Sequence, residues 1–186
     1  YYYSQPFLKA KGELTVDGQT IPVSGDAWLD REWGSQFLQS DQLGWDWFSL
    51  HLETGEKLML FQLRQNTGPD SDGNYVYGNL INKDGIKTRL DPNQIDLAVV
   101  SKVDVRGRNL PLQWRISLPQ IKRKFTIEAL HMDQWMDVDF PYWEGVIKVK
   151  GEGAENSGRG YMELTGYSAD YRNLTLTTCI YSFRVL

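Results

Sequence analysis

Two short segments place tryptophan next to ionisable side chains. Residues 28–33 (WLDREW) and residues 44–47 (GWDW) hold four of the seven tryptophans of the chain. Indole rings exclude water, which penalises a charged carboxylate and raises the pKa of the acid. Such an acid can donate a proton near neutral pH, for example to an alkene or a leaving group. Asp30 and Asp46 are therefore candidate catalytic acids.

A structural interpretation of the same two segments stays open. Arg31 can pair with Asp30, Glu32 or Asp46, and the tryptophans can simply belong to the core. For the first segment we predict a structural ion pair that involves Arg31 and Glu32.

A second group of candidates lies at residues 133–137 (DQWMD) and 142–145 (YWEG). Successive side chains of a strand point to opposite faces, so Glu144 and Trp143 are expected on opposite sides of a sheet. One of the two then lies inside a barrel. Glu144 is a third candidate acid if it lies inside, and a solvated or ion-paired residue otherwise.

The strand expected at residues 43–52 carries large apolar side chains on both faces. Alternation places Trp45, Trp47, Ser49 and His51 on one face and Asp46, Phe48, Leu50 and Leu52 on the other. In a surface sheet one face would be plainly polar. One face is therefore expected to pack a core and the other to line a cavity or a second domain. The strand expected at residues 160–167 similarly places Tyr161, Glu163, Thr165 and Tyr167 on one face.

Period-two patterns between short turn signals recur along most of the chain. Hairpin turns are expected at residues 17–20, 53–56 and 83–85, and no long window has helical spacing. We predict an all-β antiparallel fold of about ten strands with little helix. At 186 residues, one domain is the default.

Composition excludes several classes of function. A net charge of -4 argues against nucleic acid as a partner, because phosphate binding needs a basic face. No stretch approaches the roughly 20 apolar residues of a transmembrane helix. Two histidines and one cysteine cannot build a His-rich zinc site, and the common nucleophile, phosphate-loop and dinucleotide motifs are missing. We predict no metal and no cofactor.

Four motifs together are specific: residues 25–35 (GDAWLDREWGS), 44–48 (GWDWF), 142–145 (YWEG) and 160–167 (GYMELTGY). They resemble the AttH-like, or predicted secreted hydrolase, branch of the lipocalin-like family that includes the carotenoid 1,2-hydratases. The resemblance covers residues 1–167, and residues 168–186 are either an added strand or a non-native extension. Arg31 stands where the hydratases tend to have a histidine, and a permanently charged guanidinium cannot shuttle a proton.

The resemblance implies two tandem lipocalin-like, calycin-type β-barrel domains, of which residues 1–167 form the second. The partner is then an N-terminal lipocalin-like domain of the same protein. It also implies a bacterial protein that is periplasmic or secreted.

The leading prediction is a domain that binds an extended hydrophobic small molecule, such as a lipid, isoprenoid or polyketide. The site is an aromatic-lined barrel or an interdomain cleft. One alternative is a cofactor-independent hydratase, isomerase or cyclase that protonates a polyene-like substrate. Another is a structural domain that docks onto the missing N-terminal domain. The candidate ligand-binding residues are Trp33, Trp45, Trp47, His51, Tyr142, Trp143, Tyr161 and Glu163.

Overall fold

The computed structural model describes residues 1–33, 38–39, 41–66, 73–153, 156–167 and 180–185. The regular elements in these residues are thirteen strands and two short 3-10 helices, so the predicted all-β class is confirmed. The chain divides into two compact units, a smaller one of Tyr1–Phe37 with Leu176–Leu186 and a larger one of Leu38–Thr175. The boundary predicted at residue 167 stays a prediction.

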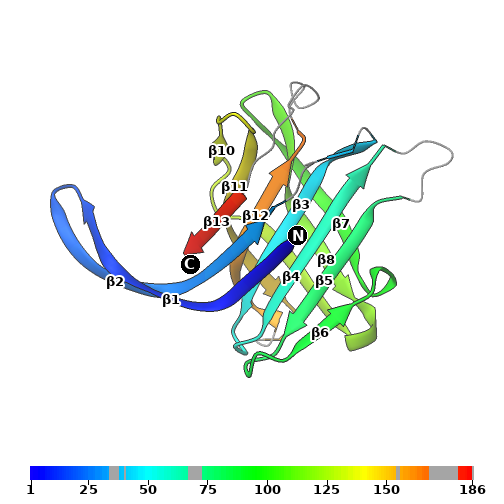
Figure 1. The fold of residues 1–186 in the computed structure, drawn as a ribbon, viewed down its shortest axis with the longest axis horizontal. Helices are drawn as coiled ribbons and strands as arrows, with labels where there is room; N and C mark the ends of the chain where they lie inside the picture. The colour runs from blue at the N-terminus through cyan, green and yellow to red at the C-terminus, as the bar shows by residue number, and fades with distance from the viewer. Residues whose placement is uncertain (34–37, 40, 67–72, 154–155, 168–179, 186) are drawn as a thin grey trace. The chain divides into compact units, whose positions relative to one another are not determined.

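The larger unit is one antiparallel sheet of ten strands that curls strongly into a half-barrel (Figure 1). Its main path runs in the order β6-β5-β4-β3-β12-β11-β9-β8-β7, with β10 paired to β11. The strands are β3 (Gln42–Leu52), β4 (Lys57–Gln65), β5 (Tyr75–Ile81), β6 (Lys87–Leu90), β7 (Asp96–Val105), β8 (Arg108–Leu118), β9 (Arg123–Ala129), β10 (Trp135–Met136), β11 (Tyr142–Gly151) and β12 (Gly158–Thr165). The helices η1 (Pro92–Gln94) and η2 (Pro119–Ile121) lie in connections between strands.

The inner side of the curled sheet is filled by apolar side chains. Phe48 on β3 packs edge-on against Trp114 on β8, with ring centres 5.4 Å apart, although three strands lie between β3 and β8 in the sheet. The buried cluster also contains Leu50, Leu60, Phe125, Ile127, Trp135, Trp143, Met162 and Leu164. Each large side chain buried in this way contributes about 1.5–3 kcal/mol. In the alternation predicted for β3, the Phe48 face is therefore the core face.

The smaller unit is a three-stranded sheet in the order β1-β2-β13, formed by β1 (Tyr2–Val16), β2 (Gln19–Glu32) and β13 (Ile180–Val185). The predicted turn joins β1 to β2, and both Asp17 and Gly18 have positive φ, of 49° and 78°. β13 lies in the segment that the family motifs do not cover. It pairs with β2 from Ile180 to Val185.

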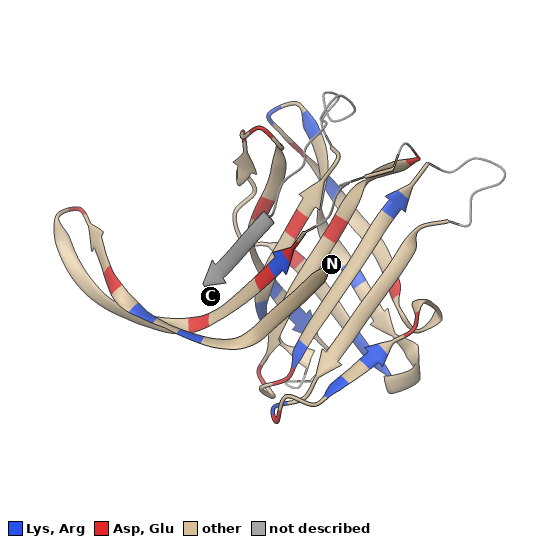
Figure 2. Cartoon of the chain, in the orientation of Figure 1, with Lys and Arg blue, Asp and Glu red and all other residues tan. Residues whose placement is uncertain are grey.

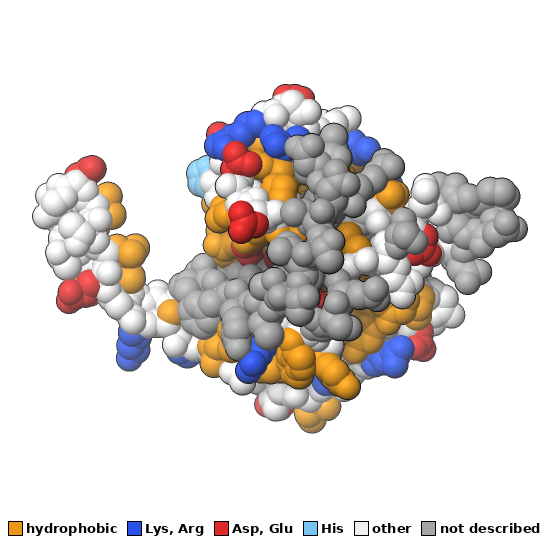
Figure 3. Space-filling model, turned by 45° about the horizontal axis from the view of Figure 1, so that its top comes forward, with side chains coloured by type: hydrophobic (Ala, Val, Ile, Leu, Met, Phe, Trp, Pro, Cys, Tyr) orange, Lys and Arg blue, Asp and Glu red, His pale blue; other side chains and the backbone are white. Residues whose placement is uncertain are grey.

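One face of the β1–β2 ribbon exposes its apolar side chains. Leu14 pairs with Ile21 and Gly12 with Val23, so alternation places Leu14, Val16, Ile21 and Val23 on one face. All four are exposed, and hydrophobic side chains on this ribbon are visible in Figure 3. A two-stranded ribbon with an uncovered apolar face is marginally stable in water.

Candidate functional site

Seven of the predicted site residues lie together on the side of the larger sheet opposite to the core. We call this side the outward face. The seven are Trp45, Trp47 and His51 on β3, Tyr161 and Glu163 on β12, and Tyr142 and Glu144 on β11. The registers put Glu144 opposite Glu163 and Glu163 opposite Trp47, so these three side chains form one row across the sheet. Acidic positions on the adjoining strands β11 and β12 can be followed in Figure 2.

At one end of this face, the Trp45 ring contacts both a second aromatic ring and a carboxylate. Trp45 Nε1 donates a hydrogen bond to Glu163 Oε1 at 2.7 Å, and its ring stacks on Phe140 with centres 5.5 Å apart. Directly opposite residues on neighbouring strands have Cβ atoms about 4.5–5.5 Å apart, which applies to Glu144 and Glu163. Two carboxyl groups are therefore within reach of one molecule bound over these rings.

The centre and far end of the outward face are polar but buried. Lys57 Nζ and His51 Nδ1 lie at hydrogen-bond distance, 2.7 Å apart, and both side chains are buried. Ser49 is completely buried, and its Oγ has no hydrogen-bond partner in the described part of the chain. A buried hydroxyl without a partner becomes satisfied when a water or a ligand oxygen forms a hydrogen bond with it.

Asp46 lies on the core face, on the other side of the sheet from the seven residues. It is completely buried and accepts hydrogen bonds from Tyr167 Oη at 2.9 Å and from Gln62 Nε2 at 3.0 Å. Arg64 Nε lies 3.2 Å from Asp46 Oδ2, and its guanidinium carbon is 4.0 Å from the centre of the Tyr167 ring. Arg64 also donates to the Thr165 carbonyl. Asp46 thus ties β3 and β4 to the segment that follows β12.

Burial raises the pKa values of Asp46 and Tyr167. Loss of hydration raises the pKa of Asp46 above its ordinary value of 3.8, against the lowering effects of Arg64, of the hydrogen bonds from Tyr167 and Gln62, and of Lys102. Burial and the nearby Asp46 charge likewise raise the pKa of Tyr167, so its hydroxyl stays a donor. A molecule on the outward face does not meet Asp46, whose contacts fit a structural role.

Comparison with known proteins agrees with this architecture. The family model described as AttH-like matches residues 1–167. The chain belongs to the AttH-like family. A solved AttH structure from Nitrosomonas europaea superposes with a TM-score of 0.76 at 36% identity, over 90% of this chain and 52% of that one. Kievitone hydratase from Nectria haematococca superposes with a TM-score of 0.70 at 21% identity, over 90% of this chain and 53% of that one, and shows the fold alone.

This AttH-like chain spans about half the length of each of these two solved proteins. No protein of the curated collection matches it.

The remaining predicted residues lie elsewhere. Trp143 is completely buried in the core of the larger unit, where its Nε1 donates to the Met132 carbonyl at 2.7 Å. It therefore does not share the outward face with Tyr142 and Glu144, its neighbours in sequence.

Four predicted residues belong to the smaller unit. Asp30 Oδ1 accepts hydrogen bonds from Tyr2 Oη at 2.5 Å, Ser4 Oγ at 2.5 Å and Trp28 Nε1 at 2.9 Å. Trp33 stacks on Tyr1 and lies under the Arg31 guanidinium, 5.4 Å from the ring centre. The ion pair predicted for Arg31 and Glu32 stays a prediction.

Sequence reasoning missed Gln62, Arg64 and Tyr167 as the partners of Asp46. The predicted turn at residues 53–56 did not supply a signal for Gln62, because counting back from it puts Leu63 opposite Asp46. The observed register pairs His51 with Lys57, one residue away from that count, and so puts Gln62 opposite Asp46. Tyr167 was expected on the face of Tyr161 and Glu163, and this was wrong because Gly166, with a φ of 73°, redirects the chain. Its hydroxyl then reaches Asp46 on the core side.

Within the described residues, no group of three or more histidine, cysteine, aspartate or glutamate side chains is arranged to hold a metal ion. No helix in the same residues has the length and apolarity needed to cross a membrane.

Proposed function

We propose that the outward face of β11, β12, β3 and β4 binds an extended hydrophobic small molecule of the lipid, isoprenoid or polyketide class. The observation that carries this proposal is the gathering of Trp45, Trp47, Tyr142 and Tyr161 with a few polar groups on one face. Aromatic side chains offer wide apolar area with polar handles, which is the usual lining of a small-molecule site. The lipocalin-like fold and the AttH-like family support this proposal.

The packing of the larger unit favours the outward face over the inside of the half-barrel. The inner side is occupied by close-packed side chains, among them Phe48, Trp114 and Trp143. Protein cores hold few voids larger than a water molecule. A ligand on the inner side would have to displace this core. On the outward face Trp45 and Trp47 are also buried, but they lie outside the core cluster, and Tyr142 and Tyr161 are partly exposed.

The second candidate function is hydration of a carbon–carbon double bond, without a redox cofactor. Glu144 is the candidate acid, because it is the predicted acid that lies on the outward face, beside Glu163. Its proton would pass to one alkene carbon, a water oxygen would bond to the neighbouring carbon, and the surplus proton of that water would return to Glu144. The faces of Trp45 and Trp47 would stabilise the intermediate cation. The structural similarity to a hydratase is the observation that favours this candidate.

Docking onto an N-terminal domain stays a prediction, as does a periplasmic or secreted location. The exposed apolar face of the β1–β2 ribbon supports docking, since such a face gains stability when it is covered.

The binding proposal is tested by native mass spectrometry with geranylgeraniol as the probe. Tyr161→Lys places a charge on the outward face and should weaken retention of the probe about tenfold or more. The matched control is Val99→Lys, which adds the same charge at an exposed position of β7. It should retain the probe as the unmodified chain does. Equal retention by Tyr161→Lys and Val99→Lys, with unchanged circular dichroism, would contradict the proposal.

A further inference from the structure

Arg108 and Trp135 form a stacked pair in the larger unit, away from the outward face. Arg108 begins β8, and Trp135 begins the short strand β10. The guanidinium carbon of Arg108 lies 4.2 Å from the centre of the Trp135 ring. Trp135 is only 5% exposed and belongs to the buried core cluster. Such stacking of arginine on tryptophan is favourable and fixes both planes.

Each member of this pair has a buried N–H group without an acceptor. Arg108 Nε and Trp135 Nε1 both lack a hydrogen-bond partner among the described residues. A buried donor left unsatisfied loses its hydration without gaining a partner. Groups of this kind are uncommon in folded proteins, and a bound water or ion is one way in which they become satisfied.

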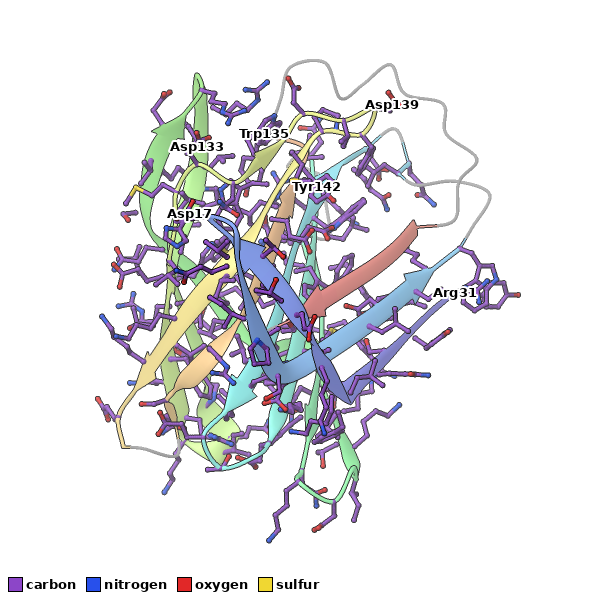
Figure 4. All side chains as sticks on the ribbon, turned by 90° about the vertical axis from the view of Figure 1, so that its left-hand side faces the viewer. Asp17, Arg31, Asp133, Trp135, Asp139 and Tyr142 are labelled. Carbon is purple, nitrogen blue, oxygen red and sulfur yellow. The ribbon has the colours of Figure 1, made fainter. Side chains whose placement is uncertain are left out.

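The neighbouring residues hold this pair in place. Arg106, in the turn between β7 and β8, binds Asp133 through two hydrogen bonds of 2.7 and 3.1 Å. Arg108 Nη1 donates to the Arg106 carbonyl at 3.0 Å, and Trp135 pairs with Trp143 on β11. Figure 4 labels Asp133 and Trp135, which lie close together in the fold. These contacts therefore fix the positions of the two donors, which are both shielded from solvent.

Arg106 and Arg108 differ in whether an acidic side chain neutralises their charge. Arg106 is paired with Asp133, whereas Arg108 takes part in no ion pair within the described residues. A partly buried guanidinium with a free Nε–H prefers an anionic oxygen, and the planar guanidinium matches a carboxylate best. Close to Trp135 in sequence, Met132 and Val138 have exposed apolar side chains. Met136 is also exposed, but it follows Trp135 in β10 and so lies on the opposite face of that strand.

We propose that Arg108 and Trp135 bind the carboxylate of a small amphiphilic acid, whose apolar chain lies over Met132 and Val138. One carboxylate oxygen accepts from Arg108 Nε and the other from Trp135 Nε1. This site is separate from the outward face and does not depend on the function proposed for that face.

The test is a titration of the protein with sodium octanoate, and with octanol as the neutral control, followed by NMR of the tryptophan indole N–H signals. The Trp135 signal, assigned by its loss in Trp135→Phe, should move downfield and saturate with octanoate but not with octanol. The Arg108 Nε–H signal should follow the same curve. Arg108→Met should weaken octanoate binding about tenfold or more, because the carboxylate loses a charge-assisted hydrogen bond.

Arg106→Met is the matched control, because it removes the neighbouring arginine, whose ion pair with Asp133 is exposed. It should change octanoate affinity by less than about twofold. Three results would overturn the proposal: no shift of the Trp135 signal, an equal shift with octanol, or equal losses of affinity in Arg106→Met and Arg108→Met. The absence of a Trp135 shift in the unmodified protein overturns the proposal by itself, even if Arg108→Met does not fold. Geranylgeraniol binding on the outward face would not change this titration, so the two proposals can fail separately.

Discussion

Gly166→Ala should lower the free energy of unfolding by about 2–5 kcal/mol. Gly166 has a φ of 73°, where a side chain is strained, and an added Cβ would overlap the Leu43 carbonyl oxygen. The substitution therefore combines backbone strain with a collision between two backbone segments. It should also move Tyr167 away from Asp46, because the turn at Gly166 is what brings the tyrosine to the core side. Urea denaturation measures the loss.

The matched control is Gly85→Ala. Gly85 has a similar φ of 83°, but an added Cβ there meets no atom within 4 Å. The control should lose only the strain energy, about 1–2 kcal/mol. If Gly166→Ala is no less stable than Gly85→Ala, the close approach of Gly166 to Leu43 is not the reason why glycine is required at position 166.

Arg64→Met should destabilise the folded protein by about 3 kcal/mol at pH 7.5 and by much less at pH 4.5. Arg64 is the main group that lowers the pKa of Asp46, so its removal raises that pKa further. The folded state then keeps a proton on Asp46 at pH values where the unfolded chain has lost it. The stability that this proton provides is complete below the ordinary value of 3.8 and is lost as pH rises through the raised pKa.

The check is urea denaturation of Arg64→Met at both pH values. The double variant Asp46→Asn/Arg64→Met is measured in parallel. The double variant has no carboxylate to leave unpaired, so it should recover most of the stability at pH 7.5 and show little dependence on pH. A loss in Arg64→Met that is the same at both pH values, or larger at pH 4.5, would show that the ion pair with Asp46 is not its origin.

The fold class and the two faces of β3 could be predicted from the sequence, because both depend on alternation within one strand. The sequence did not reveal which face is the core. Trp47 and Phe48 are both large and apolar, and both are buried. Trp114 on β8 determines which face of β3 is the core face, because it packs against Phe48 across the curled sheet. A contact between residues so far apart in sequence leaves no local pattern.

The candidate site was predictable in part for the same reason. The outward residues of β3, β11 and β12 were each identified from motifs and alternation, but their assembly depends on β12 pairing with β3, more than 100 residues away. Asp46 was selected for its tryptophan neighbours. Those rings point to the opposite face, and the groups that do contact Asp46 come from β4 and from the residue after Gly166. The unsatisfied donors of Arg108 and Trp135 have no sequence signal.

The most direct test of ligand binding on the outward face is photo-crosslinking with geranylgeraniol that carries a diazirine, read at residue resolution by mass spectrometry. Labelling should saturate, compete with unlabelled geranylgeraniol, and fall on partly exposed outward residues such as Tyr142, Tyr161 and Glu163. Their neighbours on the core face, Trp143, Met162 and Leu164, should stay unlabelled. Saturable labelling of the core-face residues, or no competition by the unlabelled alcohol, would contradict the assignment of the outward face as the binding surface.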